Sequence, residues 1–361
     1  MKLIAFYLPQ FHAIPENDEW WGEGFTEWTN TKKAKQLFKG QYQPREPYDE
    51  NYYNLLDDET KKWQVDLAKK YGIYGFCYYH YWFNGKMVLQ KPLEQVLENK
   101  DIELPFCISW ANEPWTRSWD GKTNEVLLAQ EYGDKEDWLT HFNYMLKFFK
   151  DDRYIKVNNK PILVIYKVES IPNHVELFEF WTNKAKENGL EGIYFIETLN
   201  GLQKKEVSNI SEAVIQFEPN YTIHHDRPLI DKIQNKLKNL LMMPHKGSFI
   251  YNSMDYDITW KRILKRNMKV ENKQVFLGAF VDWDNTARKG EKALVFNGAN
   301  PEKFEKYLSQ QIRKGKEDNS EFLFINAWNE WAEGTYLEPD NRNGFAYLEA
   351  VKKAVNNSNN K

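Results

Sequence analysis

The residues best suited to chemistry lie in one short segment near the carboxyl end of the chain. Residues 328–334 read Trp-Asn-Glu-Trp-Ala-Glu-Gly and follow directly on the apolar run 322–325. They place two carboxyl groups, Glu330 and Glu333, among tryptophan rings. Carboxyl pairs carry out the cleavage of glycosidic bonds, and aromatic rings stack on sugar faces. The segment therefore predicts a carbohydrate-active site with Glu330 and Glu333 as its catalytic residues.

The spacing of the two glutamates indicates how they would act. On one helical turn, residues three apart lie about 5–6 Å from each other. Retaining glycosidases hold their carboxyls about 5–5.5 Å apart and inverting ones about 6.5–9.5 Å, so the spacing favours retention. In a dry site both carboxyls cannot easily ionise, so the pKa of one rises and that group serves as the acid. A solvated helix face is the alternative explanation, and the preceding buried strand disfavours it.

A second polar and aromatic segment follows another apolar run. Residues 110–120 read Trp-Ala-Asn-Glu-Pro-Trp-Thr-Arg-Ser-Trp-Asp. Amide and guanidinium groups can bind sugar hydroxyls, and a third carboxylate is available here. The alternative is a polar loop in which Glu113 pairs with Arg117. The predicted sugar-binding residues are Trp110, Asn112, Glu113, Trp115, Arg117 and Trp119.

Two further apolar runs end in polar and aromatic residues. His80, at the end of the second expected strand, is either a sugar ligand or a structural hydrogen-bonding residue.

At the end of the seventh expected strand, Asp282 and Asp284 form a short Asp-x-Asp pattern of the kind that metal-dependent nucleotide-sugar transferases use. His224–Asp226 lacks recognised zinc spacing and no glycine-rich phosphate loop is present, so neither a metal nor a cofactor is predicted. The sugar-binding residues expected at these ends are His80, Trp82, Trp283, Asp284, Asn285 and Arg288.

Strand-like and helical runs alternate along the chain, which indicates parallel βα units. Eight such strands predict a (β/α)8 barrel, whose site forms from the loops at the carboxyl ends of the strands. A doubly wound open sheet is the runner-up, but no strand precedes a G-x-G-x-x-G turn. The expected strands are 3–8, 73–79, 106–110, 162–166, 193–197, 213–217, 275–280 and 322–328, and the main helices 60–70, 92–99, 138–150, 175–188, 301–314 and 345–355.

Two connections are long within what is expected to be one domain over residues 1–361. Residues 9–58 follow the first strand, and residues 219–273 follow the sixth. The second connection is basic, with 11 Lys/Arg against 5 Asp/Glu between residues 226 and 273. A solvated insertion explains it, and so does a lid or a surface for an anionic or lipid-carried partner, with peripheral membrane contact through 226–273. Helix is expected at 258–269.

Composition limits the class of partner. The formal charge of −3 and the pI near 6.2 argue against nucleic acid, whereas 14 Trp, 21 Tyr and 22 Phe suit an oligo- or polysaccharide substrate. Cys77 and Cys107 sit in apolar runs and are expected to be reduced core residues. The sequence has no apolar run of about 18 residues and no signal-peptide pattern at its start, so a cytoplasmic protein without a spanning helix is expected.

Several blocks of the sequence resemble the WbsX-type proteins of polysaccharide and O-antigen biosynthesis, which are often described as glycosyltransferases. These blocks are residues 6–12, 20–28, 75–83, 110–120, 284–288 and 328–334. The resemblance covers nearly the whole chain and is weakest over 219–273. It brings further residues into the expected sugar-binding set, namely Tyr7, Gln10, His12, Trp20, Trp28, Asn329 and Trp331.

That family is similar in turn to glycoside hydrolase family 99, endo-α-mannosidases with (β/α)8 barrels, whose Asn-Glu-Trp-x-Glu-Gly block matches residues 329–334. The resemblance implies that Glu330 takes the proton of a sugar 2-hydroxyl, giving a 1,2-anhydro intermediate, while Glu333 is the acid/base at the glycosidic oxygen. The leading interpretation is a retaining glycoside hydrolase or transglycosylase. The alternatives are a glycosyltransferase of lipopolysaccharide, O-antigen or capsule assembly and a non-catalytic glycan-binding module.

Overall fold

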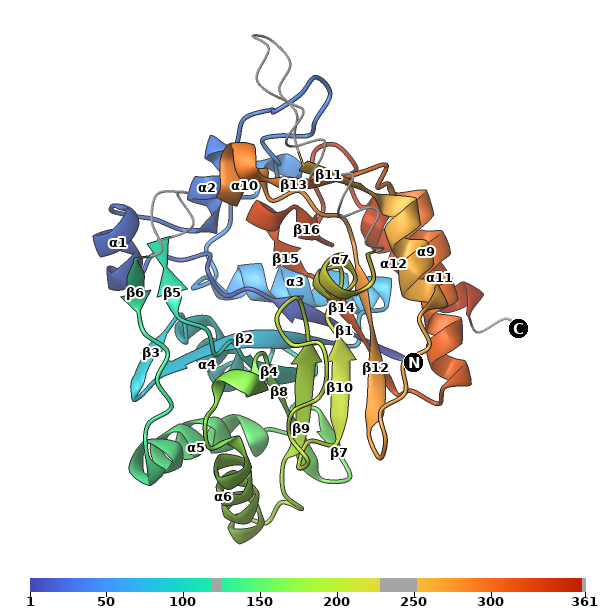
Figure 1. Ribbon diagram of the computed structural model, residues 1–361. Coiled ribbons are helices and arrows are strands. Elements are labelled where there is room, and N and C mark those ends of the chain that lie inside the picture. Colours follow the sequence, from blue (N-terminus) through green and yellow to red (C-terminus); the bar gives the residue numbers. More distant parts are fainter. Residues whose placement is uncertain (118–124, 228–251, 359–361) are drawn as a thin grey trace.

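Eight parallel strands close into a barrel in the computed structural model, which describes residues 1–117, 125–227 and 252–358 (Figure 1). The (β/α)8 prediction is confirmed, and each of the eight expected strands is present. The last strand ends at Asn326, two residues earlier than expected. In order around the barrel the strands are β1 (Lys2–Tyr7), β14 (Phe322–Asn326), β12 (Gln274–Phe280), β10 (Ala213–Gln216), β9 (Tyr194–Leu199), β8 (Lys160–Ile165), β4 (Phe106–Trp110) and β2 (Gly75–Phe83).

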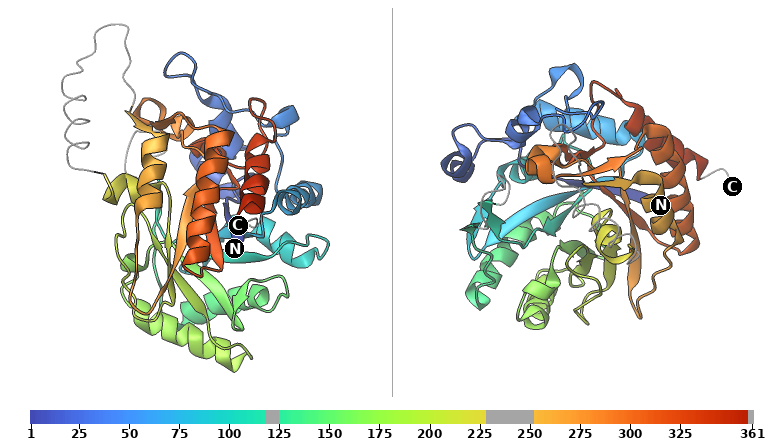
Figure 2. Two further views of the ribbon diagram at one scale, coloured as in Figure 1. Left: turned by 90° about the vertical axis from the view of Figure 1, so that its right-hand side faces the viewer. Right: turned by 45° about the horizontal axis from the view of Figure 1, so that its top comes forward.

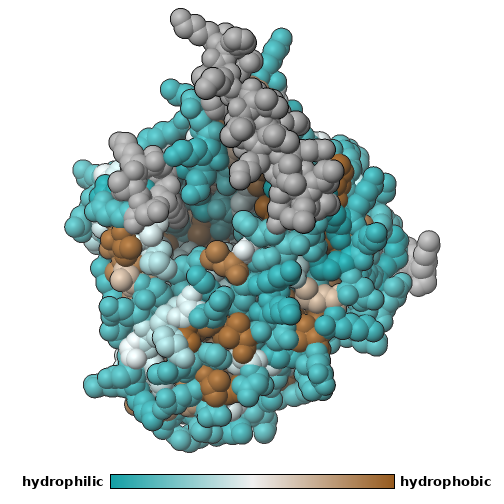
Figure 3. Space-filling view, viewed as in Figure 1, coloured by the Kyte–Doolittle hydropathy of each residue, from teal (hydrophilic) through white to brown (hydrophobic). Residues whose placement is uncertain are grey.

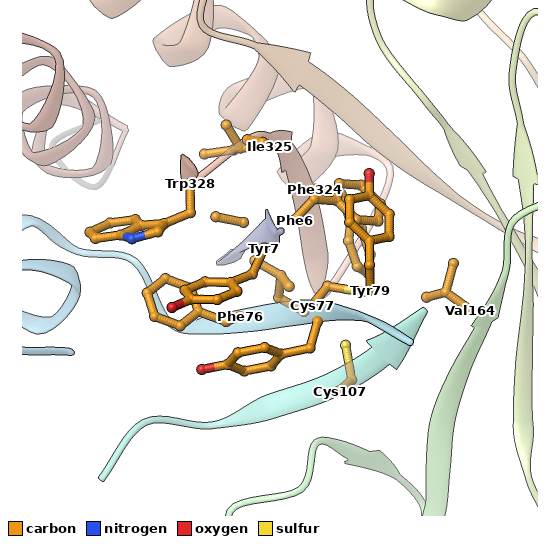
Figure 4. Close-up of a cluster of buried hydrophobic side chains, with 14 of the residues drawn as sticks. Phe6, Tyr7, Phe76, Cys77, Tyr79, Cys107, Val164, Phe324, Ile325 and Trp328 are labelled. Atoms are coloured by element: carbon orange, nitrogen blue, oxygen red, sulfur yellow. The ribbon is translucent and has the colours of Figure 1, made fainter. Parts of the chain in front are cut away.

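The first strand closes the ring, because β1 pairs in parallel with both β14 and β2. Ala5 is in register with Ile325 on one side and with Phe76 on the other. Aromatic side chains fill the core where these strands meet, as Figure 4 shows. The two cysteines face each other in register across β2 and β4, and both are buried free thiols.

Helices surround the barrel, and their ends follow local sequence rules. Pro301 occupies the first turn of α11, where a missing N–H costs nothing, and the Asn300 side chain accepts a hydrogen bond from the Lys303 N–H. Asp255 caps the helix expected at 258–269, which begins two residues earlier and ends four residues earlier, at Lys265. Figure 2 shows α11 and α12 side by side outside the sheet. The outer helices are α3 (Asp58–Tyr71), α4 (Lys91–Glu98), α5 (Lys135–Phe149), α6 (His174–Glu187), α9 (Tyr256–Lys265), α11 (Pro301–Glu317) and α12 (Ala346–Asn357).

The connection after β1 lies over the carboxyl ends of the barrel strands (Figure 1). It contains α1 (Pro15–Trp21), α2 (Glu27–Lys33) and η1 (Tyr48–Glu50). Other short elements complete this face or flank the strands. They are β3 (Lys86–Val88), β5 (Trp115–Thr116), β6 (Val126–Leu128), β7 (Lys156–Val157), η3 (Val168–Ser170), α7 (Asn220–His225), β11 (Asn252–Asp255), α10 (Thr286–Lys289), η4 (Gly290–Lys292), β13 (Leu294–Asn297), β15 (Asn329–Glu330), η5 (Trp331–Glu333) and β16 (Thr335–Tyr336).

The basic connection after β10 is only partly described, since residues 228–251, including the apolar stretch 237–243, lie outside the described ranges. In the described part, two of its cations are committed to internal ion pairs. Arg266 Nη1 lies 2.5 Å from Glu218 Oε1, and Lys273 Nζ lies 3.2 Å from Glu197 Oε1. These pairs tie the connection to the barrel, so the count of basic residues overstates the charge that the segment offers to a partner.

The surface seen in Figure 3 is mainly hydrophilic, with apolar side chains in small, scattered groups. Over the described ranges, each helix is too short or too polar to cross a lipid bilayer.

Candidate active site

A cavity of about 250 Å³ opens at the carboxyl ends of the barrel strands, the position that the fold predicts. Strands β1, β4, β8, β10 and β14 each bring residues to it at or just beyond their ends, and β2 (Gly75–Phe83) brings Tyr79 and Tyr81 from its second half. Of the residues predicted from the sequence, Gln10, Glu113, Trp115, Arg288, Glu330 and Glu333 line it. Residues that the sequence analysis did not select also line it, among them Trp21, Tyr79, Tyr81, Tyr166, Phe217, Asn220 and Asn326.

Arg288 joins the two glutamates in this cavity. Its Nη2 lies 2.9 Å from Glu330 Oε2, and its Nη1 lies 2.7 Å from Glu333 Oε1. The Glu330 side chain is 8% exposed and that of Glu333 is 24% exposed. One guanidinium therefore holds both carboxyls side by side, one deep in the cavity and the other closer to solvent.

The backbone around the two glutamates explains this arrangement. Glu330 ends the short strand β15, which pairs with β16, and a 3₁₀ turn then carries the chain from Trp331 to Glu333. The turn ends at Gly334, whose φ is 66° and where an added Cβ would meet the Asp284 backbone at 2.7 Å. Only glycine fits there without strain. The expected helical turn is thus present only in part, because the 3₁₀ turn contains Glu333 while Glu330 precedes it in β15.

A third carboxylate, Glu27, contacts the same arginine and was not selected from the sequence. Glu27 Oε1 lies 2.8 Å from Arg288 Nη2 and 3.2 Å from the Ala332 N–H nitrogen, which it accepts as a hydrogen bond. The side chain is fully buried and does not line the cavity. The sequence signal that pointed to Glu27 was its place in the block 20–28, from which only Trp20 and Trp28 were selected as site residues.

Burial raises the pKa of Glu330 to about 8. Arg288 opposes this shift, whereas Glu333 and Glu27 add to it by repulsion. Glu113, on another side of the cavity, also has a raised pKa because of burial, with Lys167 opposing. The residue spacing predicted that one pKa of the pair would rise, and the shift falls on Glu330.

Aromatic rings form part of the cavity wall. Trp115 packs edge-on against Tyr81, with ring centroids 5.3 Å apart, and against Trp20 at 5.8 Å. Trp21, the neighbour of Trp20 on α1, lines the cavity as well. The wall therefore offers both stacking faces and phenol groups to a ligand.

Several predicted sugar-binding residues lie beneath the cavity rather than in it. Trp28 and Trp331 pack on each other with centroids 5.2 Å apart, and Trp331 Nε1 donates to Glu338 Oε2 at 2.7 Å. Burial raises the pKa of Glu338 to about 7, while hydrogen bonds from Trp331, Gln64 and Tyr53 oppose the shift. The Tyr7 hydroxyl donates to Gln64 at 2.6 Å. These residues form a buried support for the segment that carries Glu330 and Glu333.

The predicted residues of β2 and β4 point toward the outer helices. His80 Nε2 lies 2.9 Å from His141 Nε2, and Trp82 stacks on His141 at 4.4 Å. Burial lowers the pKa of His80 to about 3, so the ring is neutral. Trp110 packs edge-on against the same histidine. Asn112 is buried and bonded to the Lys167 backbone through both its amide nitrogen and its oxygen.

The remaining predicted residues also have contacts away from the cavity. His12 is buried, which lowers its pKa to about 4, and Trp283 is a core residue. Asn285 accepts the Leu294 N–H, and Arg117 pairs with Glu125. Trp119 lies outside the described residues.

The Asp-x-Asp pattern borders a second cavity of about 300 Å³. Asp282 is ion-paired with Arg45 at 2.8 Å, and Asp284 accepts a hydrogen bond from Gln41 at 2.9 Å. Within the described ranges, His, Cys, Asp and Glu side chains form no group of three that could hold a metal ion. Both aspartates are thus bonded to side chains of the loop after β1.

Comparison with known proteins gives both a family and a fold. The sequence profile described as "Glycosyltransferase WbsX" matches residues 3–351. Two relatives from strains of Xanthomonas campestris pv. campestris, both named uncharacterized protein WxcX, are 34% identical over 360 residues. The match covers 98% of this chain and 49% of each relative, so the chain spans about half their length.

Solved structures share the barrel at low sequence identity. A GH99 endo-α-mannosidase from Bacteroides thetaiotaomicron has a TM-score of 0.58 and 14% identity, covering 99% of this chain and 97% of that chain. A protein described as glycoside hydrolase-like has a TM-score of 0.58 and 13% identity, covering 98% and 93%. These likenesses show the fold alone. The profile match over nearly the whole length places this chain in the WbsX glycosyltransferase family.

Proposed function

We propose that the protein is a retaining glycoside hydrolase, or a transglycosylase, that acts on an oligo- or polysaccharide. The observation that carries this proposal is the pair Glu330 and Glu333, both bound by Arg288 in an aromatic-lined cavity at the carboxyl end of the barrel. The shared guanidinium keeps the carboxyls close, which suits retention better than the wider spacing of inverting enzymes. The glycosidase-like barrel supports the same class of enzyme.

In the proposed reaction Glu330 takes the proton from the sugar 2-hydroxyl, and that oxygen attacks C1 to form a 1,2-anhydro sugar. The bond from C1 to the glycosidic oxygen breaks as Glu333 protonates the leaving oxygen. Glu333 then takes a proton from water, which attacks C1 and opens the anhydro ring while Glu330 returns its proton to O2. Two displacements at C1 give retention. A sugar hydroxyl in place of water would give transfer.

The two environments suit these roles. Glu333 is the more exposed carboxyl, as a group that exchanges protons with leaving group and water requires. Glu330 is buried, and its pKa of about 8 makes its carboxylate an unusually strong base for a hydroxyl proton. A carboxyl whose pKa is raised also suits the acid, which would exchange the roles of Glu330 and Glu333. A substrate whose leaving group needs little protonation separates the two assignments.

The test is digestion of a glycan panel by the full chain, with the products identified by mass spectrometry. Glu330→Gln and Glu333→Gln should each lower kcat/KM about 10²–10⁴-fold on a cleaved or elongated glycan. Glu103→Gln is the matched control, because the Glu103 side chain is 73% exposed and pairs with Lys69 at the surface. Full turnover in both cavity variants would exclude this pair as the catalytic residues.

Because the family is described as glycosyltransferases, transfer from a nucleotide sugar is the competing function. Calorimetry with nucleotide sugars, with and without manganese, tests whether the protein binds such a donor. Donor binding that requires manganese and is lost in Asp282→Asn would favour a transferase. Glycan binding with neither cleavage nor transfer would instead favour a binding module.

A further inference from the structure

Glu27 is the most enclosed carboxylate of the site, and the proposed reaction gives it no role. Its side chain is fully buried. Oε1 receives hydrogen bonds from Arg288 and from the Ala332 N–H, whereas Oε2 has no hydrogen-bond partner among the described residues. A buried carboxylate with so few donors depends on a nearby cation. For Glu27 that cation is Arg288.

Arg288 is shared unequally between its three carboxylates. Nη1 lies 2.7 Å from Glu333, while Nη2 lies 2.8 Å from Glu27 and 2.9 Å from Glu330. Glu27 and Glu330 therefore share one nitrogen, which carries two N–H groups. We propose that Glu27 is a positioning residue for the proposed reaction. It holds Arg288 between Glu330 and Glu333, and its negative charge offsets part of the positive charge that Arg288 presents to Glu330.

The attachment of Glu27 suits this role. It begins α2, with Thr26 as the cap, and its N–H donates to the Gln10 carbonyl at 2.9 Å. The next residue, Trp28, packs against Trp331. Glu27 is thus fixed from the loop after β1 and, through Ala332, from the segment between Glu330 and Glu333. It reaches the reaction through Arg288 rather than through the substrate.

The charged and titratable surroundings of Glu330 agree with this arrangement. Burial is the largest cause of its raised pKa, Arg288 opposes it, and Glu333 and then Glu27 increase it. Tyr79, Tyr81 and Tyr166 line the same cavity, and burial raises the pKa of each, so they are neutral near pH 8. Removing the charge of Glu27 should therefore make Glu330 ionise at lower pH.

The experiment is a titration of the full chain labelled with ¹³C at the glutamate carboxyls, followed by NMR. The Glu330 signal is identified by its loss in Glu330→Gln. In Glu27→Gln the side-chain oxygen can still accept the Ala332 N–H, and the midpoint of Glu330 should fall by about one pH unit. Glu23→Gln is the matched control, since it removes the same charge from an exposed position of the same loop and should leave the midpoint unchanged.

A folded Glu27→Gln protein with an unchanged Glu330 midpoint would overturn the proposal. If that variant does not fold, Glu27→Asp takes its place. Its shorter side chain withdraws from Arg288, so a smaller fall is expected and an unchanged midpoint again counts against the idea. Failure of both variants to fold would make Glu27 a residue of the fold alone and would also overturn it.

This inference rests on the proposed function for its meaning, but its test needs no substrate. If no glycan is cleaved or extended, the proposed function fails while the titration still decides how Glu27 affects Glu330. If a substrate is found, the pH profile of kcat/KM should move in Glu27→Gln in parallel with the Glu330 midpoint. A merely structural defect would lower the rate at every pH without moving the profile.

Discussion

The side chain of Asn329 forms two hydrogen bonds with the backbone of Leu8. Its Oδ1 accepts the Leu8 N–H at 2.8 Å, and its Nδ2 donates to the Leu8 carbonyl at 3.0 Å. Leu8 follows directly on β1 and lines the cavity, and Asn329 precedes Glu330. These hydrogen bonds thus join the end of the first barrel strand to the segment after the last one, immediately beside Glu330.

Asn329→Ala should lower the free energy of unfolding by about 2–3 kcal/mol, because it leaves two buried backbone groups of Leu8 without partners. The measurement is urea unfolding followed by circular dichroism. Asn357→Ala is the control, since Asn357 is exposed and makes one hydrogen bond to Glu305 at 3.3 Å. An equal loss in both variants would show that the joint with Leu8 adds nothing to stability.

The pH dependence of kcat/KM should show that Glu330 takes part in the proton transfer, and a second substrate should show which proton it moves. The reaction needs one carboxyl of the pair ionised and the other protonated, so kcat/KM should follow a bell-shaped profile with one limb near pH 8, where Glu330 titrates. Which glutamate is the acid is decided with an aryl glycoside, whose leaving group needs little protonation. This substrate should restore much of the activity of Glu333→Gln and little of that of Glu330→Gln. Circular dichroism over the same pH range checks that the fold persists, and rescue of Glu330→Gln instead would exchange the two roles.

Tryptophans in and below the cavity should respond differently to substitution. Trp331→Phe keeps a ring against Tyr336 but removes the hydrogen bond to the buried Glu338, and should cost about 1.5–3 kcal/mol of stability. Trp21→Ala removes a ring from the cavity wall and should raise KM with little change in stability. Thermal unfolding and substrate kinetics on both proteins make the comparison. Similar profiles for the two variants would contradict it.

The internal ion pairs of the basic connection should matter more than surface ones. Lys273→Met leaves the fully buried Glu197 carboxylate without its cation and should destabilise the protein by about 3–5 kcal/mol. Lys69→Met breaks an exposed pair with Glu103 and should cost less than about 1 kcal/mol. Urea unfolding of both variants measures the difference. Equal small effects would mean that Glu197 is satisfied without Lys273.

The barrel could be predicted because its strands are continuous apolar runs, which signal strands covered on both faces. The carboxylate pair could be predicted because Glu330 and Glu333 stand next to such a run, and Arg288 lay in a recognisable block. Glu27 could not, because its partner Arg288 is 261 positions away and meets it only after the barrel closes.

The alternation of side chains along β2 explains why two residues predicted to bind sugar from this strand lie away from the cavity. From the sequence, this strand is expected to end at residue 79, with His80 and Trp82 beyond it, whereas it continues to Phe83. Side chains alternate between the faces of a strand. Tyr79 and Tyr81 therefore face the cavity, while His80 and Trp82 contact His141 on α5. Aromatic type alone carries no information about this alternation.

The contact between Arg288 and Glu27 also has a consequence for how the protein is made. A growing chain exposes Glu27 early, but its partner is separated from it by 261 positions and appears only after seven of the eight barrel strands have been synthesised. Contacts between residues so far apart in sequence form late, because the intervening chain must first be ordered. A ligand that binds only the assembled cavity would therefore report that synthesis and folding are finished, and not merely that the polypeptide is compact.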